Sequence, residues 1–139
     1  MGVEVIPALA AKEITVTTLT ATNQTFASAT VTDLTITGLT KTAPAALTIA
    51  AGALTVTKVW TKINTQGGGA ADDLDTINGG TSGNLIICSA FNAGHEVTFK
   101  DGTGNLALAG DFTTTGLEDT IMLLYNGTNW IEISRSINV

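Results

Sequence analysis

Hydrophobic and polar positions alternate over short segments along most of the chain, which is the period of a β-strand. A Thr-rich alternation at 15–22 is repeated at 30–37, an offset of 15 residues, and a looser third copy spans 47–57 around an Ala-Gly turn signal. No ten-residue segment keeps the 3.6-residue period of a helix, and 70–74 has room for one helical turn at most. The pattern therefore predicts an all-β protein.

In the first two Thr-rich copies the alternation of apolar and polar positions shifts by one residue at the same place. The steps from Val16 to Leu19 and from Val31 to Leu34 are odd, so a corner or bulge must restore the buried face. Short cornered strands in tandem are typical of a β-helix or β-prism. Each copy offers few apolar groups, so we expect identical chains to share them in a homotrimer. The alternative is a monomeric sandwich in which these strands pack on the rest of the chain. The predicted trimer interface comprises Val16, Leu19, Val31, Leu34, Ile36 and Leu39.

The second half of the chain predicts antiparallel hairpins. Residues 84–89 form the most apolar strand, which we expect at the centre of a sheet. Residues 96–100 precede an Asp-Gly-Thr-Gly-Asn turn and a short strand at 106–108, and 120–125 precede an Asn-Gly-Thr-Asn turn and a strand at 130–134. These elements suffice for a small antiparallel barrel or sandwich.

Charge and composition change along the chain near 65–69. The 139 residues carry a net charge of −6, but the part through Lys62 has three acids and four bases, and the remainder has nine acids and two bases. Thr and Ala dominate before this point, and Gly, Asn and Asp turns follow. We therefore expect an extended arm over 1–13, a Thr-rich oligomerisation repeat over 14–64 and an antiparallel β domain over 65–139.

Composition also excludes several classes of function. The acidic balance repels phosphate backbones, so we expect no nucleic-acid partner. One cysteine and one histidine cannot supply a zinc site. No apolar run approaches the roughly 18 residues of a membrane-spanning helix, and the start lacks a basic leader region, so we expect a product made in a cytoplasm and not bound to a membrane.

The predicted arm holds apolar residues without turn signals that would fold it back. Pro7 interrupts a central strand and favours an extended conformation at Ile6. An apolar extended segment is satisfied by lying on a partner surface, with packing on its own trimer or disorder as alternatives. The residues expected to make this contact are Val3, Val5, Ile6, Pro7 and Leu9.

The polar candidates favour structural roles. Asp72, Asp73 and Asp75 lack the glycine and glutamate spacing of a calcium loop, so we expect them to bond backbone groups in a turn. Cys88 lies in the most apolar strand, where a thiol packs as a small hydrophobic group, and this disfavours catalysis with His95. We expect no catalytic residue, no cofactor and no bound metal.

Three aromatic residues have two interpretations. Trp60, Tyr125 and Trp130 would stack on a sugar if exposed. Tyr125 and Trp130 flank a tight turn, however, and few other aromatics are present to build a core. We therefore expect these two to pack the last hairpin, with contact to a cell-surface glycan as the alternative.

Five segments of the second half form a recognisable series: DDLDTINGG at 72–80, KDGTGNL at 100–106, GDF at 110–112, YNGTNW at 125–130 and EISRS at 132–136. Together they resemble a module of tailed-bacteriophage virion proteins, which is found in capsid decoration proteins and at the ends of trimeric head and tail fibres. The resemblance covers roughly 45–139, and the Thr-rich repeat is similar to the β-helical shafts of such fibres.

The resemblance implies a structural virion protein. The short chain has no long shaft, which favours a homotrimeric decoration, or cement, protein that binds the major capsid protein on the outer face of the capsid. The alternatives are the receptor- or carbohydrate-binding tip of a fibre and, more distantly, a polysaccharide-degrading enzyme.

Overall fold

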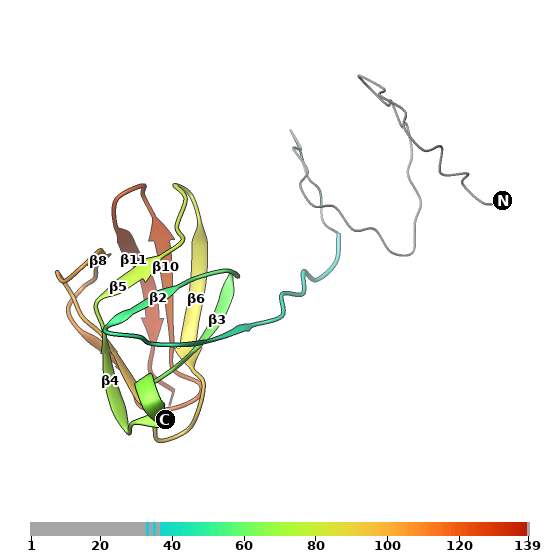
Figure 1. The fold of residues 1–139 in the computed structure, drawn as a ribbon. Helices are drawn as coiled ribbons and strands as arrows, with labels where there is room; N and C mark the ends of the chain where they lie inside the picture. Colours follow the sequence, from blue (N-terminus) through green and yellow to red (C-terminus); the bar gives the residue numbers. More distant parts are fainter. Residues whose placement is uncertain (1–32, 34, 36, 139) are drawn as a thin grey trace, which may run out of the picture. The chain divides into compact units, whose positions relative to one another are not determined.

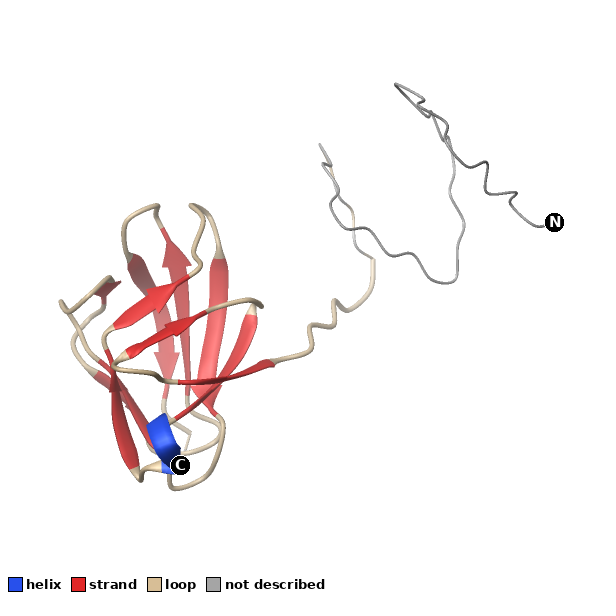
Figure 2. Ribbon diagram, viewed as in Figure 1, coloured by secondary structure: helices blue, strands red, loops and turns tan. Residues whose placement is uncertain are grey.

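The computed structural model describes residues 33, 35 and 37–138, and this part of the chain contains eleven short strands and one 3₁₀ turn (Figures 1 and 2). The strands belong to one folded unit that begins at Gly38. The elements are β1 (Ala45–Thr48), β2 (Ala53–Thr55), β3 (Trp60–Asn64), η1 (Gln66–Gly68), β4 (Ala71–Leu74), β5 (Thr76–Asn78), β6 (Leu85–Ala90), β7 (Glu96–Phe99), β8 (Leu106–Ala107), β9 (Phe112–Thr114), β10 (Thr120–Tyr125) and β11 (Trp130–Ser136).

Strands β1 to β7 stack in parallel as about three turns of a β-solenoid-like coil. One face of the coil is the parallel series β1–β3–β6, a second face is β2–β5, and a third is β4–β7. The first turn is therefore β1–β2, the second is β3–β4–β5, and the third starts with β6–β7. Among the described strands, β1 pairs with β3 alone, so its other edge is open. The all-β prediction is confirmed.

The last strands close the other end of the coil. β10 pairs antiparallel with β6 and with β11, and β11 pairs parallel with β8. The six-stranded sheet thus runs β1–β3–β6–β10–β11–β8, with β6 in its interior as expected. The hairpin predicted at 120–134 is confirmed, and a β-bulge between Met122 and Leu123 shifts its register.

The hairpin predicted over 96–108 is wrong. β7 pairs parallel with β4 and antiparallel with β9, whereas β8 pairs with β11. The turn between β7 and β8 forms a corner of the coil, which passes the chain from one face to another. The segment 70–74 is likewise not helical, because it forms β4 and pairs with β7.

One hydrophobic core fills the coil and continues under the closing hairpin. Trp130, Phe99 and Phe112 are its largest fully buried side chains, and the two phenylalanine ring centroids lie 6.0 Å apart. Leu74 and Ile77 come from the second turn of the coil. The buried cluster is Ile49, Leu54, Val56, Ile63, Leu74, Ile77, Ile86, Cys88, Val97, Phe99, Leu106, Phe112, Ile121, Leu123 and Trp130.

The third Thr-rich copy forms the first turn of this coil. Leu47 lies in β1, Leu54 lies in β2, and the corner between them uses Ala51 and Gly52, both with positive φ angles of 52° and 74°. The boundary expected near 65–69 consequently falls inside the folded unit, since β3 pairs with both β1 and β6.

The first two Thr-rich copies and the arm fall outside the described residues, apart from Asp33, Thr35 and Thr37. The contacts predicted for Val3, Val5, Ile6, Pro7 and Leu9, and the trimer contacts predicted for Val16, Leu19, Val31, Leu34 and Ile36, are therefore not described. Leu39, the remaining member of that set, is fully exposed. Within the described ranges, no helix has the length and apolar character needed to span a membrane.

Candidate functional site

Tyr125 and Trp130 form an aromatic pair at the end of the β10–β11 hairpin. Their ring centroids lie 5.0 Å apart, and Trp130 is fully buried. A Cβ at Gly80 would lie 2.8 Å from the Tyr125 ring and 2.9 Å from the Trp130 ring, so glycine is required there. Trp130 has no exposed face on which a sugar could stack. Trp130 therefore packs inside the hairpin, with the partly exposed Tyr125 against it.

Asn105 fastens the closing hairpin to the second turn of the coil. Its side-chain Oδ1 accepts from the Ile77 N–H at 2.9 Å, and its Nδ2 donates to the Ile77 carbonyl at 2.8 Å. The side-chain amide thus bonds β5 as a further strand beside it would, and extends the β2–β5 ladder by one step. Trp130 donates through its ring Nε1 to the same carbonyl at 2.9 Å and through its backbone N–H to the Asn105 carbonyl at 2.8 Å.

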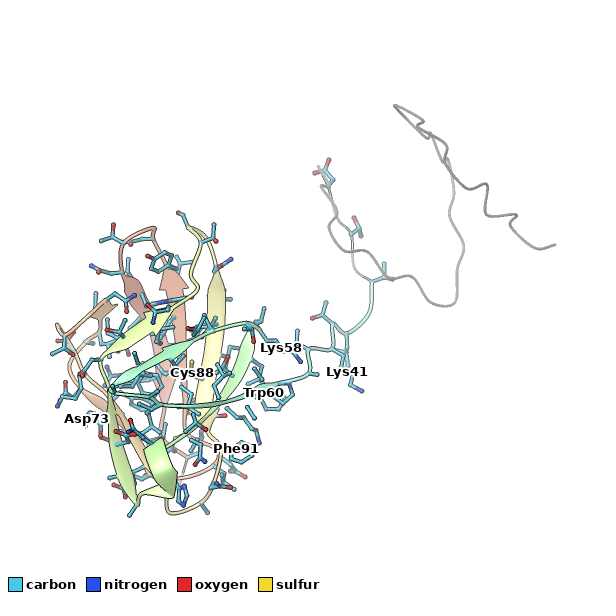
Figure 3. All side chains as sticks on the ribbon, in the orientation of Figure 1. Lys41, Lys58, Trp60, Asp73, Cys88 and Phe91 are labelled. Atoms are coloured by element: carbon cyan, nitrogen blue, oxygen red, sulfur yellow. The ribbon has the colours of Figure 1, made fainter. Side chains whose placement is uncertain are left out.

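Asp72 and Asp75 bond backbone or hydroxyl groups through their side chains, but Asp72 and Asp73 lie in a strand and not in the predicted turn. Asp72 lies in β4 and accepts from the Gln66 N–H at 2.7 Å, which fixes the approach from η1. Asp75 follows β4 and accepts from the Thr103 hydroxyl at 3.1 Å. Asp73 also lies in β4 and is exposed (Figure 3). Among the described residues, no three His, Cys, Asp or Glu side chains gather as metal ligands.

The Gly-rich loop after β7 is held by its own side chains. Asp101 Oδ1 accepts from the Leu108 N–H at 2.7 Å, and Asp111 Oδ1 accepts from the Asp101 N–H at 2.8 Å. Lys100 Nζ forms an ion pair with Asp111, and this hydrogen bond raises the pKa of Lys100 and lowers the pKa of Asp111. The loop leads into β8 and not into a helix, so it lacks the helix N-terminus of a phosphate-binding loop.

Asp119 holds the turn that precedes β10. The side chain is fully buried, and this burial acts to raise its pKa. Hydrogen bonds from the backbone N–H groups of Asn138, Thr115 and Gly116, at 2.7–2.9 Å, and from the Thr115 hydroxyl at 3.0 Å outweigh that effect and lower the pKa. The charged Asp119 side chain therefore connects the turn to the C-terminal segment through hydrogen bonds.

Cys88 and His95 have separate environments. Cys88 lies in β6 with its side chain in the core, and burial raises the pKa of its thiol to about 12 (Figure 3). A thiol of that pKa carries almost no nucleophilic thiolate at neutral pH. His95 Nδ1 lies 2.8 Å from Asn64 Oδ1 and 3.3 Å from Thr65 Oγ1, so the imidazole bridges to the end of β3.

A groove of about 370 Å³ lies on the outer surface of the six-stranded sheet, beside Trp60. Trp60 is partly exposed, and the ammonium of Lys62 lies 5.6 Å from its ring centroid. The Ser89 hydroxyl is buried in this groove and has no hydrogen-bond partner among the residues that the structure describes. The groove is lined by Thr42, Trp60, Lys62, Ile87, Ser89, Leu117, Glu118 and Thr120.

Sequence reasoning missed this groove. Trp60 was a candidate for sugar stacking, but nothing in its neighbourhood along the chain links it to Ser89 or Glu118. The connection depends on the parallel pairing of β3 with β6, which places Lys62 opposite Ser89, and on the pairing of β6 with β10, which places Ser89 opposite Thr120.

Comparisons with protein-family models, with curated proteins and with solved structures found no match to this chain.

Proposed function

We propose that the chain is a structural protein of a tailed-phage virion, a homotrimer that decorates the outer face of the capsid and stabilises the shell by binding the major capsid protein. The observation that carries the proposal is the use of the polar side chains in the folded unit. Asp72, Asp101, Asp111 and Asp119 bond backbone N–H groups at corners of the coil. These carboxylates hold the fold together, which suits a protein that has to be rigid.

The segments that resemble phage virion modules each have a structural role in this fold. The 72–80 segment supplies β4 and β5, and the 100–106 segment supplies the corner that carries Asn105. The 125–130 segment supplies the turn and aromatic pair of the hairpin. The resemblance therefore rests on the residues that hold the coil and its closing hairpin together, which supports a common architecture and, with it, a common kind of role.

The test is binding of the purified full chain to purified capsids that lack decoration. We expect co-sedimentation at hundreds of copies per particle and an increased temperature of shell disassembly. Deleting 2–12 should abolish co-sedimentation and leave the oligomer intact, because the apolar arm is the proposed anchor on the shell. A truncated chain that decorates shells with unchanged affinity would place the contact in the folded unit.

The groove beside Trp60 favours one alternative, the tip of a fibre that binds a cell-surface glycan. A partly exposed indole with nearby hydroxyl and charged groups has the composition of a sugar-binding surface. A glycan array probed with the full chain separates the two functions, together with the copy number per particle. Glycan binding that is lost in Trp60→Ala, at few copies per particle, would favour the fibre tip over the decoration protein.

A further inference from the structure

The outer surface of the six-stranded sheet carries two rows of apolar side chains. In the first row Trp60 lies opposite Ile87, which lies opposite Met122. In the second row Leu85 lies opposite Leu124, which lies opposite Ile131. The rows are two residues apart along β6 and β10, so they occupy the same side of the sheet. We call these six residues the outer apolar face.

These side chains point away from the core. Their neighbours along the strands, among them Ile86, Cys88 and Leu123, are buried at 0–3% exposure, whereas Leu85 is 40% exposed and Ile131 is 37% exposed. Ile133, at the bulge beside this face, is 53% exposed. The other four, Trp60, Ile87, Met122 and Leu124, are half-buried, so the six residues form an apolar strip across four adjacent strands. Apolar surface gathered in this way marks an interaction site.

The distribution of charge favours a second copy of this chain as the occupant, with Glu118 the one acid that lines the groove together with Lys62. Residues 38–64 carry Lys41, Lys58 and Lys62 and no acid, whereas 65–138 carry nine acids and two bases. In Figure 3, Lys41, Lys58 and Trp60 lie on one side of the folded unit and Asp73 on the other. A two-fold contact through the β1–β3 side would place these lysines against their own copies. A cyclic, head-to-tail contact instead places the lysines of one copy against the acidic part of the next.

We infer that the outer apolar face is the contact between copies of this chain in a cyclic trimer, with the groove beside Trp60 receiving a polar side chain of the neighbouring copy. This inference rests on the trimer of the proposed function and moves its main contact from the Thr-rich repeat to the six-stranded sheet. It also accounts for the Ser89 hydroxyl, since a donor or acceptor from the neighbour would satisfy this buried group.

Light scattering after size exclusion tests the face in the full chain. The wild-type chain should give three times its 14.2 kDa mass. Leu85→Glu and Ile131→Glu should weaken the assembly at least tenfold and give 14.2 kDa monomers at micromolar concentration, because a carboxylate would be buried in the contact. Ile137→Glu is the matched control, since Ile137 follows β11 and is 60% exposed, and it should remain a trimer.

A thiol-labelling experiment covers the case in which a glutamate variant does not fold. Ile131→Cys and Ile137→Cys are treated with a maleimide, and the native Cys88 contributes no background because it is fully buried. At concentrations where the chain is a trimer, Ile131→Cys should react at least tenfold more slowly than Ile137→Cys. Dilution to the monomer should remove the difference.

The outcomes separate the two proposals. Equal labelling rates within a stable trimer would overturn the inference and leave the capsid role standing. A monomeric wild-type chain would overturn the inference and the trimeric part of the proposed function. A protected Ile131→Cys trimer that fails to bind capsids would support the inference and overturn the capsid role. Protection of Ile131→Cys in a monomer, by the chain's own N-terminal segment or by a glycan probe, would also overturn the inference.

Discussion

Trp130 joins the closing hairpin to the coil through three different contacts: its ring fills the core, its Nε1 bonds Ile77, and its face packs on Tyr125. We expect Trp130→Ala to lower the free energy of unfolding by about 3–5 kcal/mol, because a large cavity forms. Trp130→Phe should cost less than Trp130→Ala, since a smaller ring remains while the Nε1 bond is lost. Urea titrations followed by circular dichroism measure both. Equal costs for the two variants would contradict a role in filling the core.

Asp119 gives a prediction about acid. Its pKa is lowered in the folded protein, so the stability it contributes is fully present above the unfolded value of about 3.9 and is lost as the pH falls through the lower folded value. Asp119→Asn should cost about 1–3 kcal/mol at pH 7, and the difference from wild type should shrink below about pH 4. Urea titrations between pH 7 and pH 2 test this.

Glu118→Gln is the control for Asp119→Asn, because Glu118 is the adjacent carboxylate and its side chain is exposed. It should leave the free energy of unfolding unchanged across the same pH range. An Asp119→Asn penalty that stays constant down to pH 2 would show that the lost stability does not depend on the charge of Asp119.

At the scale of elements, Asn105 extends the ladder of β5 with a side chain in place of a strand. Replacing it by alanine leaves the Ile77 N–H without that partner and leaves its carbonyl with the bond from Trp130 alone. We expect a cost of about 1–3 kcal/mol in urea titrations. Asn78→Ala, at the exposed next residue of β5, is the matched control and should change stability by less than about 0.5 kcal/mol. Equal effects would contradict the fastening role.

Alanine substitutions at two glycines in the corner before β8 distinguish the cost of backbone strain from the cost of steric crowding. Gly102 and Gly104 both have positive φ angles, 69° and 51°, so alanine at either position costs about 1–2 kcal/mol in conformational strain. A Cβ at Gly104 would also lie 2.2 Å from the Asp75 carbonyl oxygen, whereas one at Gly102 meets nothing within 4 Å. Gly104→Ala should therefore cost about 1–3 kcal/mol more than Gly102→Ala in thermal or urea unfolding. Equal costs would show that the backbone of this corner shifts to make room for the added Cβ at Gly104.

The sequence predicted elements better than it predicted their partners. The β10–β11 hairpin could be recognised because the partner strand is the next one along the chain and the Asn126 turn fixes the pairing. The strand at Glu96–Phe99 was also recognised, but its partners lie 25 residues earlier, in β4, and beyond the next strand, in β9. Alternation indicates which side chains are buried and does not indicate which strand pairs with which.

At the scale of the whole molecule, the sequence does not reveal the parallel stacking because paired strands are separated by different numbers of residues. Ala45 pairs with Thr61, an offset of 16 residues, whereas Trp60 pairs with Ile87, an offset of 27 residues. A coil whose turns differ in length leaves no fixed period after the Thr-rich repeat, so the second half was interpreted as a separate antiparallel domain. The groove beside Trp60 was unpredictable for the same reason, because it joins residues from β3, β6 and the turn before β10.

One core implies one cooperative transition for the folded unit. Trp60 lies in β3, before the boundary expected from composition, and Trp130 lies in β11, after it. Trp60→Phe leaves Trp130 as the sole tryptophan, and Trp130→Phe leaves Trp60. We expect tryptophan fluorescence and far-ultraviolet circular dichroism to give coincident urea transitions within each variant. A Trp60 signal that changes before the circular dichroism of the same variant would indicate two separately folding parts.

One edge of β1 pairs with no described strand, and this has an evolutionary consequence. In a coil of this kind each turn touches only the turns beside it, so the free energy of folding is close to a sum of nearest-neighbour contributions. Duplicating or deleting one whole turn on the side of β1 would change the length of the stack by about 4.8 Å, the spacing between paired strands, and leave the closing hairpin and its aromatic pair untouched. The length of the coil and the hairpin that ends it can therefore change independently of each other. A coil built in this way is expected to lengthen or shorten in single-turn steps that leave the closing hairpin unchanged.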